Sequence, residues 1–243
     1  MNARRLLANL LSPPLCVFCG RAIDVRTAYN VCADCADSIP YNNKKACGIC
    51  GAPLDISYGD LYCGACRHTK RAFARNVSRF VYKEAVADAL RLMKFGKGNL
   101  WIADTLGGFL SQTVAERYGG IAFDAVLYVP VSGKRLRQRG FNQTEIIAEA
   151  VCEKLGLYKA EGILVKPKDT PKQSGLKIAE RKANVREAFA VKNGDFLIDK
   201  TVLLIDDICT TGATLHACAR TLKKAGAAVV YCATVASTEP GRG

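Results

Sequence analysis

Two adjacent carboxylates, Asp206 and Asp207, follow four apolar residues in the stretch VLLIDDICTTGAT (202–214). A turn rich in threonine comes next, and a helix is predicted after Gly212. Backbone N–H groups at the amino terminus of a helix bind anions, and hydroxyl groups add further donors. Two carboxylates beside a phosphate suit the hydroxyls of an attached sugar, directly or through Mg²⁺. The pattern therefore indicates a site for a phosphorylated sugar. The hydroxyl donors are Thr210, Thr211 and Thr214.

Three other interpretations of the acid pair explain less of the pattern. A Walker B strand also ends in two acids, but the sequence contains no G-x-x-x-x-G-K-[ST] motif to accompany it. The acids of a response regulator would lie near the start of their domain, whereas these lie close to the end of the chain. An acidic strand end that only caps a helix leaves three threonines around a glycine unexplained. We therefore prefer the sugar-phosphate site.

Eight of the twelve cysteines form four C-x-x-C pairs before residue 67. A shift of 31 residues places the first two pairs on the second two, and Gly20 and Gly51 then coincide. Two C-x-x-C turns supply the four thiolates of a tetrahedral zinc site. Disulfides are disfavoured because we expect no export signal, and a thioredoxin-like motif needs one pair at a strand–helix junction. The predicted ligands of two structural zinc ions are Cys16, Cys19, Cys32, Cys35, Cys47, Cys50, Cys63 and Cys66.

The spacing leaves open how these cysteines pair around the metal. Sequential pairing gives one zinc site per repeat, whereas a cross-brace would interleave the two repeats. The tandem repeat favours sequential pairing, because each copy is then self-sufficient. Segments of about thirty residues bury too little apolar surface to fold alone, so the metal must stabilise them. The four remaining cysteines stand singly in apolar segments and are expected to act as small hydrophobic residues.

From about residue 77 onward, predicted strands alternate with predicted helices. This alternation predicts an α/β fold with a mostly parallel sheet flanked by helices, whose ligands lie at the carboxyl ends of the strands. Asn142 and Glu145 resemble a capping box, and Gly107 with Gly108 is expected to loosen the helix around them. The predicted strands are 77–82, 125–131, 163–166, 202–205 and 227–236, and the predicted helices are 83–95, 99–117, 142–155 and the segment after Gly212.

Charge and hydropathy limit the class of protein. The chain has 243 residues, of which 49% are hydrophobic, and a formal net charge of +13 that concentrates in 134–139, 166–177 and 181–186. Such a basic surface binds phosphate on nucleic acid or on a small substrate, or is simply solvated. No apolar run reaches the roughly 18 residues of a membrane span. The opening MNARRLLANLLSPPLC has too short an apolar core for a signal peptide. We therefore expect a cytoplasmic protein.

Three segments resemble known families. The stretch 202–214 resembles the phosphoribosyl-pyrophosphate (PRPP) loop of type I phosphoribosyltransferases, in which two acids precede T-T/S-G-x-T. The stretches VPVSGKRLRQRGFNQTEIIA (129–148) and TPKQSGLKIAERKANVREAFAV (170–191) resemble the ComF (competence protein F) family, which includes GntX-like proteins. Its members often carry an amino-terminal double zinc ribbon. The resemblance implies a double zinc ribbon over 1–68 and a type I phosphoribosyltransferase-like domain over 69–243.

The resemblance also implies a role for each matching segment. Asp206 and Asp207 would hold the ribose hydroxyls of PRPP, and the turn 210–214, with Gly212 and Ala213, would hold its 5′-phosphate. Such enzymes displace pyrophosphate from C1 of the ribose, helped by Mg²⁺ and by donors aimed at the leaving group. The implied pyrophosphate contacts are Lys134, Arg135, Arg137, Arg139 and Gly140, and the implied residues of a mobile covering loop are Thr170, Gln173, Arg181 and Asn184.

Two functions of different classes follow from these patterns. The first is transfer of the phosphoribosyl group of Mg–PRPP to an acceptor that the sequence does not identify. The second is a non-enzymatic accessory of DNA uptake (natural competence), in which the basic face and the zinc ribbons bind single-stranded DNA and DNA-uptake proteins are partners. Aromatic residues for base stacking are sparse, at 8% of the chain. The paired cysteine spacing disfavours a redox or disulfide-exchange protein.

Overall fold

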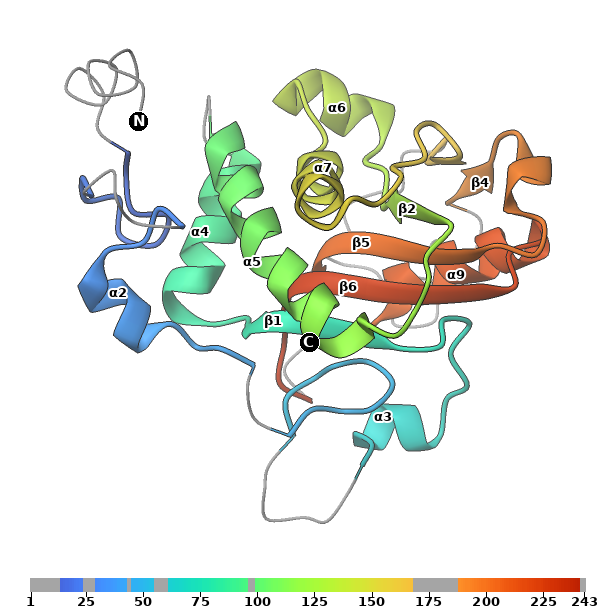
Figure 1. Cartoon of the computed structure of the whole chain (residues 1–243), viewed down its shortest axis with the longest axis horizontal. Coiled ribbons are helices and arrows are strands. Elements are labelled where there is room, and N and C mark those ends of the chain that lie inside the picture. Colours follow the sequence, from blue (N-terminus) through green and yellow to red (C-terminus); the bar gives the residue numbers. More distant parts are fainter. Residues whose placement is uncertain are drawn as a thin grey trace.

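The central layer of the protein is a parallel sheet with the strand order β1–β6–β5–β2 (Figure 1). The computed structural model describes residues 14–23, 29–42, 45–54, 61–95, 99–167 and 188–240. Its main strands are β1 (Asn76–Val81), β2 (Ala125–Tyr128), β5 (Thr201–Cys209) and β6 (Val229–Ser237). The predicted parallel sheet is therefore confirmed. β6, the last strand in the described residues, lies inside the sheet, between β1 and β5.

Helices cover both faces of this sheet. The long helices are α4 (Glu84–Phe95), α5 (Leu100–Tyr118), α7 (Gln143–Leu155) and α9 (Ala213–Lys224). The first three share one core with Leu203 and Ile205 of β5, whereas α9 packs on the other face with Val202 and Leu204. Successive residues of a strand face opposite sides, so β5 must be apolar on both faces. None of the helices in the described part of the chain is both long and apolar enough to cross a bilayer.

Gly107 lies where α5 packs against α7, and it lets these two helices approach closely. A Cβ atom at this position would lie 2.7 Å from Ala150 Cβ and 2.8 Å from the Ile147 carbonyl oxygen. At the neighbouring Gly108 a Cβ atom would meet only the Tyr29 ring, at 3.5 Å. The expectation that these glycines loosen the helix is therefore wrong. The helix runs through both without a break, and Gly107 serves close packing.

Some short elements differ from the sequence expectation. The predicted strand near 163–166 is β3 (Leu164–Val165), which pairs antiparallel with β4 (Ala190–Val191) outside the main sheet. A short helix that the sequence did not predict, α6 (Gly133–Arg139), follows β2 and ends at Gly140, whose φ is +82°. A 3₁₀ turn, η1 (Gly194–Leu197), precedes β5. These local differences leave the order of the main strands and helices unchanged.

The start of α7 forms only half of the predicted capping box. The Asn142 side chain accepts a hydrogen bond from the Thr144 backbone N–H, as an N-cap residue does. Glu145 instead accepts a hydrogen bond from the Tyr128 hydroxyl at 3.1 Å. The reciprocal contact of a capping box is therefore replaced by a link between α7 and β2.

The amino-terminal segments pack on the edge strand β1. Two short helices, α2 (Ala33–Ser38) and α3 (Gly64–Arg67), belong to these segments. Between the helices Tyr41 forms an antiparallel bridge with Phe80 of β1. At Gly51, whose φ is +71°, a Cβ atom would lie 2.7 Å from the Asn76 carbonyl oxygen. Because the amino-terminal segments approach this closely, β1 is covered along part of its length and is not a free edge.

Candidate functional site

Both acids of the 202–214 stretch lie inside β5, not after it. The strand continues to Cys209, so its predicted end at Ile205 is too early. Asp206 and Asp207 are 7% and 6% exposed, and as neighbours on a strand they point to opposite faces of the sheet. A buried carboxylate is unfavourable unless a proton, a cation or hydrogen bonds compensate its charge. The two acids are compensated in different ways.

Asp207 is paired with a lysine from another helix. Lys94 Nζ, in the last turn of α4, lies 2.8 Å from Asp207 Oδ2. Gln143 Nε2, at the start of α7, donates a hydrogen bond to the same oxygen at 3.1 Å. Gln143 Oε1 in turn accepts a hydrogen bond from Arg139 Nη1 at 3.1 Å. Gln143 therefore joins the acid of β5 to the basic helix α6.

Lys94 and Gln143 are site residues that the sequence analysis did not select. Gln143 stands inside the RLRQRGFNQ signature, so the signature could have identified it. Lys94 lies near the end of a predicted helix, in the sequence MKFGK, which matches no known motif. Its place beside the acid depends on the packing of α4 on the sheet.

Asp206 is compensated by a proton. Burial, followed by the negative charge of Asp207, raises the pKa of Asp206 from 3.8 to about 8. The Asp207 backbone N–H donates a hydrogen bond to Asp206 Oδ1 at 2.8 Å, which opposes this rise without cancelling it. At neutral pH, Asp206 is therefore mostly protonated in the ligand-free protein.

The turn after β5 has the geometry predicted for an anion site. Gly212 has a φ of +69°, and Ala213 begins α9. Thr210 and Thr211 are exposed, and Thr214 is half-buried. Thr211 Oγ1 accepts a hydrogen bond from the Ala213 backbone N–H at 3.3 Å. The turn 210–214 therefore surrounds the amino terminus of a twelve-residue helix, where N–H groups and the helix dipole favour an anion.

The segment that follows the second pair of C-x-x-C motifs lies against this turn. A Cβ atom at Gly212 would lie 3.7 Å from the Phe73 ring and 3.8 Å from Arg71 Cζ. His216 Nδ1, on α9, accepts a hydrogen bond from the Ala72 backbone N–H at 3.0 Å. The cysteine-rich part of the chain is thereby connected to the turn, and His216 holds this connection in place.

The basic residues of the RLRQRG segment lie along α6. Lys134, Arg135 and Arg137 are exposed. Arg139 is partly buried, and its guanidinium lies 5.1 Å from the centre of the Phe95 ring, which is itself 75% exposed. Gly140 ends the helix, so that the chain turns toward Gln143. The structure therefore connects Arg139 to Asp207 through Gln143. The predicted loop residues Thr170, Gln173, Arg181 and Asn184 lie outside the described residues.

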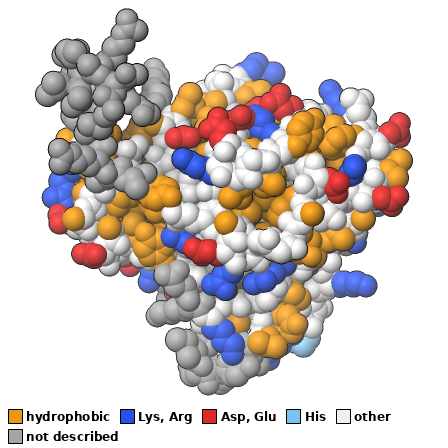
Figure 2. Space-filling model, in the orientation of Figure 1, with side chains coloured by type: hydrophobic (Ala, Val, Ile, Leu, Met, Phe, Trp, Pro, Cys, Tyr) orange, Lys and Arg blue, Asp and Glu red, His pale blue; other side chains and the backbone are white. Residues whose placement is uncertain are grey.

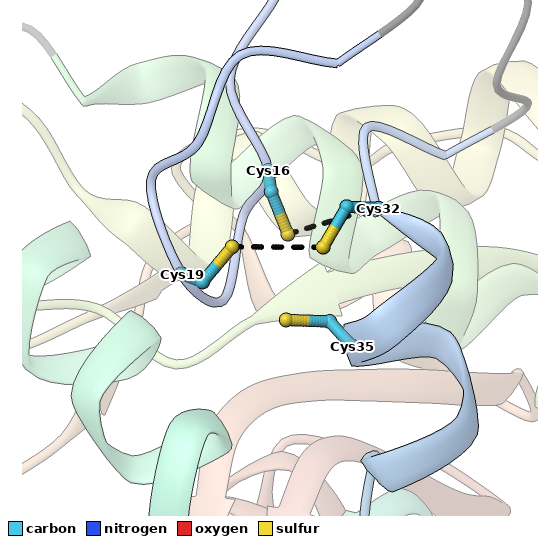
Figure 3. Close-up of side chains that lie close together, drawn as sticks. All are labelled: Cys16, Cys19, Cys32 and Cys35. Carbon is cyan, nitrogen blue, oxygen red and sulfur yellow. Dashed lines mark hydrogen bonds between the residues drawn. The ribbon is translucent and has the colours of Figure 1, made fainter.

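The eight paired cysteines gather in two groups of four. In Figure 3, Cys16, Cys19, Cys32 and Cys35 point toward one another from two C-x-x-C segments. Within each group all four Sγ atoms lie within 4.8 Å of one another, and in each one pair is 3.6 Å apart. Zn–S bonds of about 2.3 Å require a tetrahedral edge of about 3.8 Å, so both groups fit zinc. The second group is Cys47, Cys50, Cys63 and Cys66. The pairing is sequential, as the tandem repeat favours.

The two groups share a backbone plan but differ in exposure. Gly20 and Gly51 have the same φ of +71°, and a short helix begins after the third cysteine of each group. All four cysteines of the second group are buried, whereas Cys19 of the first is exposed. Hydrogen bonding from Arg21 lowers the pKa of Cys19 to about 6. This exposed thiol is therefore mostly thiolate, the form that binds metal, at neutral pH.

Comparisons with known proteins agree with this arrangement. Residues 7–67 match the double zinc ribbon domain, and residues 146–242 match the phosphoribosyl transferase domain. Competence protein F of Haemophilus influenzae is 28% identical over 219 residues, which cover 87% of this chain and 91% of that protein. The DNA utilization protein YhgH of Salmonella typhimurium is 28% identical over 224 residues, covering 91% and 96%. These matches confirm the resemblance to the ComF family and the predicted fold class.

Solved structures resemble the chain more weakly. A phosphoribosyltransferase from Corynebacterium diphtheriae is 18% identical and superimposes with a TM-score of 0.35. The match covers 61% of this chain and 72% of that protein chain. A likeness of this size carries no argument about the site. The fold assignment depends instead on the matched domain and on the parallel sheet with its flanking helices.

We expect two zinc ions per chain, measured by elemental mass spectrometry on protein purified without chelators. Replacing Cys47 and Cys50 together with serine should lower the count to one, because each repeat holds its own ion. Cys152→Ser is the matched control, since this buried cysteine stands alone and its loss should leave both ions in place. A count of one or zero in the unaltered protein would contradict the assignment.

The raised pKa of Asp206 predicts that stability falls as pH rises. The folded chain keeps the Asp206 proton up to about pH 8, whereas the unfolded chain loses it near 3.8. Stability should therefore decrease between these values, by at most about 1.4 kcal/mol per pH unit. Denaturant unfolding from pH 6 to 8.5, with zinc retained, should show a flatter profile for Asp206→Asn than for the unaltered protein.

The control for this pH profile is Asp195→Asn, which alters an exposed acid on the turn before β5. Its profile should parallel that of the unaltered protein. If the stability difference between the unaltered protein and Asp206→Asn stays constant over this range, Asp206 does not hold a proton in the folded state.

Proposed function

We propose that this ComF-like protein, which joins a double zinc ribbon to a phosphoribosyl transferase domain, binds Mg–PRPP at the carboxyl ends of β5 and β2. One observation supports this more than any other: Gln143 donates a hydrogen bond to Asp207 and accepts one from Arg139. PRPP carries its pyrophosphate directly on the ribose. A ribose-binding acid and a pyrophosphate-binding arginine must therefore be neighbours, and Gln143 makes them so.

Each proposed contact uses a chemical feature of this site. Asp206 and Asp207 would hold the ribose hydroxyls, and the turn 210–214 at the start of α9 would hold the 5′-phosphate. Arg139 and the exposed cations of α6 would face the pyrophosphate. The Lys94 amine, which contacts Asp207 in the ligand-free protein, would share that carboxylate with the incoming sugar.

The proposed reaction is a displacement at C1 of the ribose. The bond from C1 to the pyrophosphate oxygen breaks, pyrophosphate leaves with the electron pair, and C1 forms a bond to a nucleophile of the acceptor. Negative charge grows on the leaving group, so Arg139 and its neighbours on α6 would lower the barrier. Mg²⁺ bound with PRPP would neutralise part of the same charge, and carboxylates such as Asp207 are ligands that it prefers.

We expect calorimetric titration to show that the protein binds PRPP in the presence of Mg²⁺. Replacing Asp206 and Asp207 together with asparagine should weaken this binding by more than about 100-fold, because an amide cannot replace the negative charge of Asp207. Gln143→Leu should weaken it less, since Arg139 and Asp207 remain but lose their common partner.

Asp195→Asn serves as the control for charge and should bind PRPP as the unaltered protein does. Absence of PRPP binding by the unaltered protein would overturn the proposal. Once binding is established, release of pyrophosphate from PRPP in the presence of fractionated metabolite pools would identify the acceptor.

Binding of single-stranded DNA is a second candidate function. The relatives bear names that refer to competence and to DNA utilization. The net charge of +13 and the exposed cations of α6 favour contact with a phosphate backbone. Since α6 also faces the proposed pyrophosphate site, one cationic surface would serve both ligands.

This second candidate predicts salt-dependent binding of a labelled single-stranded oligonucleotide, measured by fluorescence anisotropy. Replacing Arg135 and Arg137 with glutamine should weaken binding and reduce the slope of log affinity against log salt by about 1.4. Replacing Lys223 and Lys224, in the last turn of α9, removes equal charge and should have little effect. If the affinity does not depend on salt, or if the α6 substitutions leave it unchanged, α6 is not the DNA-binding surface.

A further inference from the structure

A cavity of about 370 Å³ lies where the second zinc ribbon meets the α/β core. We call it the junction cavity. Its walls come from the second ribbon, from residues 75–79 at β1, and from the last turns of α5. In Figure 1, β1 and the last turns of α5 lie directly above the second ribbon, which carries α3. The volume is within the range of pockets that hold small-molecule ligands.

The junction cavity is strongly basic. Four cations line it, namely Lys45, Arg75, Arg79 and Arg117. Glu116 is the one acid among the described lining residues, and its carboxylate lies 3.8 Å from the Arg79 guanidinium. In Figure 2, Lys and Arg side chains gather on this junction between the lower lobe and the core. The net charge of the lining therefore favours an anionic ligand.

Several buried polar atoms of the lining have no hydrogen-bond partner among the described residues. The Asn42 amide donates through Nδ2 to the Gly51 carbonyl oxygen at 2.8 Å, and the Asn76 amide donates to the Cys50 carbonyl oxygen at 2.9 Å. These bonds fix the orientation of both amides. The unpartnered atoms are Asn42 Oδ1, Asn76 Oδ1, Thr113 Oγ1, Arg75 Nε and Arg79 Nε.

The unpartnered atoms belong to side chains that are deeply buried. Asn42 is 7% exposed, Asn76 is 1% exposed and Thr113 is 5% exposed. These atoms are themselves closed to water, so they lie behind the cavity wall and do not open into it. The groups open to a ligand are therefore the cations, of which Lys45 and Arg117 are exposed.

We infer that the junction cavity binds a phosphorylated ligand of mononucleotide size. The phosphate would meet the arginines and Lys45, because guanidinium groups bind phosphate oxygens through charge-assisted hydrogen bonds. The volume of about 370 Å³ leaves room for a sugar and a base beside the phosphate. Either a free nucleotide or the end of a nucleic-acid strand supplies this chemistry.

This site is separate from the one proposed for PRPP. The cavity lies along β1, and β6 stands between β1 and β5, which carries the acids. The lining includes none of the residues proposed to contact PRPP. It does include Cys47 and Gly51 of the second ribbon, so the cavity exists only when that ribbon is docked. The second ribbon thereby acquires a role as one wall of a binding site.

The test uses the zinc-loaded, full-length chain carrying Asp206→Asn and Asp207→Asn, with Arg135 and Arg137 also replaced by glutamine, so that the acids and the exposed arginines of α6 do not contribute. Calorimetric titrations with inorganic phosphate, with deoxyadenosine monophosphate and with a 5′-phosphorylated single-stranded oligonucleotide compare the ligands. We expect the nucleotide to bind more tightly than phosphate. Replacing Lys45 and Arg117 with glutamine, both exposed at the cavity, should weaken binding at least tenfold.

A further variant keeps this test decisive. Replacing Lys223 and Lys224 removes the same charge elsewhere and should leave binding unchanged. Equal affinity for nucleotide and oligonucleotide indicates a free nucleotide, and tighter oligonucleotide binding indicates a strand end. The inference fails if phosphate and nucleotide do not bind, or if the Lys45 and Arg117 changes have no effect.

Discussion

The negative charge of Asp207, buried within a parallel strand, is the constraint around which the candidate site is organised. Lys94 from α4 and Gln143 from α7 both contact its carboxylate, and Gln143 brings Arg139 of α6 into the same network. Two helices thus meet at one carboxylate, and a third, α6, joins them through Gln143. Asp206, on the opposite face, is instead compensated by a proton, because burial outweighs the influence of nearby cations. Two acids that are neighbours in sequence therefore have different electrostatic roles.

The zinc ribbons pack against the α/β domain and form part of one architecture with it. Each cysteine group fits a metal ion that a segment of this size needs for stability. Yet both ribbons also pack on the core: Tyr29 stacks on Phe109 of α5 at 4.7 Å, and Gly51 lies against Asn76 at the start of β1. The segment after the second ribbon then reaches the turn at Gly212. A boundary at residue 68 remains a prediction. Residues on its two sides contact each other, so the ribbons and the core are linked.

Patterns that depend on neighbouring residues were the most reliable guides to this protein. The cysteine spacing predicted two four-cysteine groups, and the apolar runs predicted each main strand, because these features arise from local geometry. Predictions that depended on a partner from elsewhere were less successful. Gly107 was expected to loosen α5, but it instead allows α5 to pack closely against Ala150 and Ile147 of α7. Glu145 was expected to complete a capping box, but its carboxylate accepts a hydrogen bond from the Tyr128 hydroxyl instead.

The sequence by itself determined the types of chemistry in this protein: thiolates in metal-binding pairs, and an acid pair ahead of an anion-binding turn. Only the tertiary structure decided which residues share a site. Lys94 meets Asp207 because α4 and β5 pack together, and the polar lining of the junction cavity forms because a ribbon docks on β1. Such contacts join residues far apart in the chain, and their energy depends on burial and on distance, which no local pattern encodes.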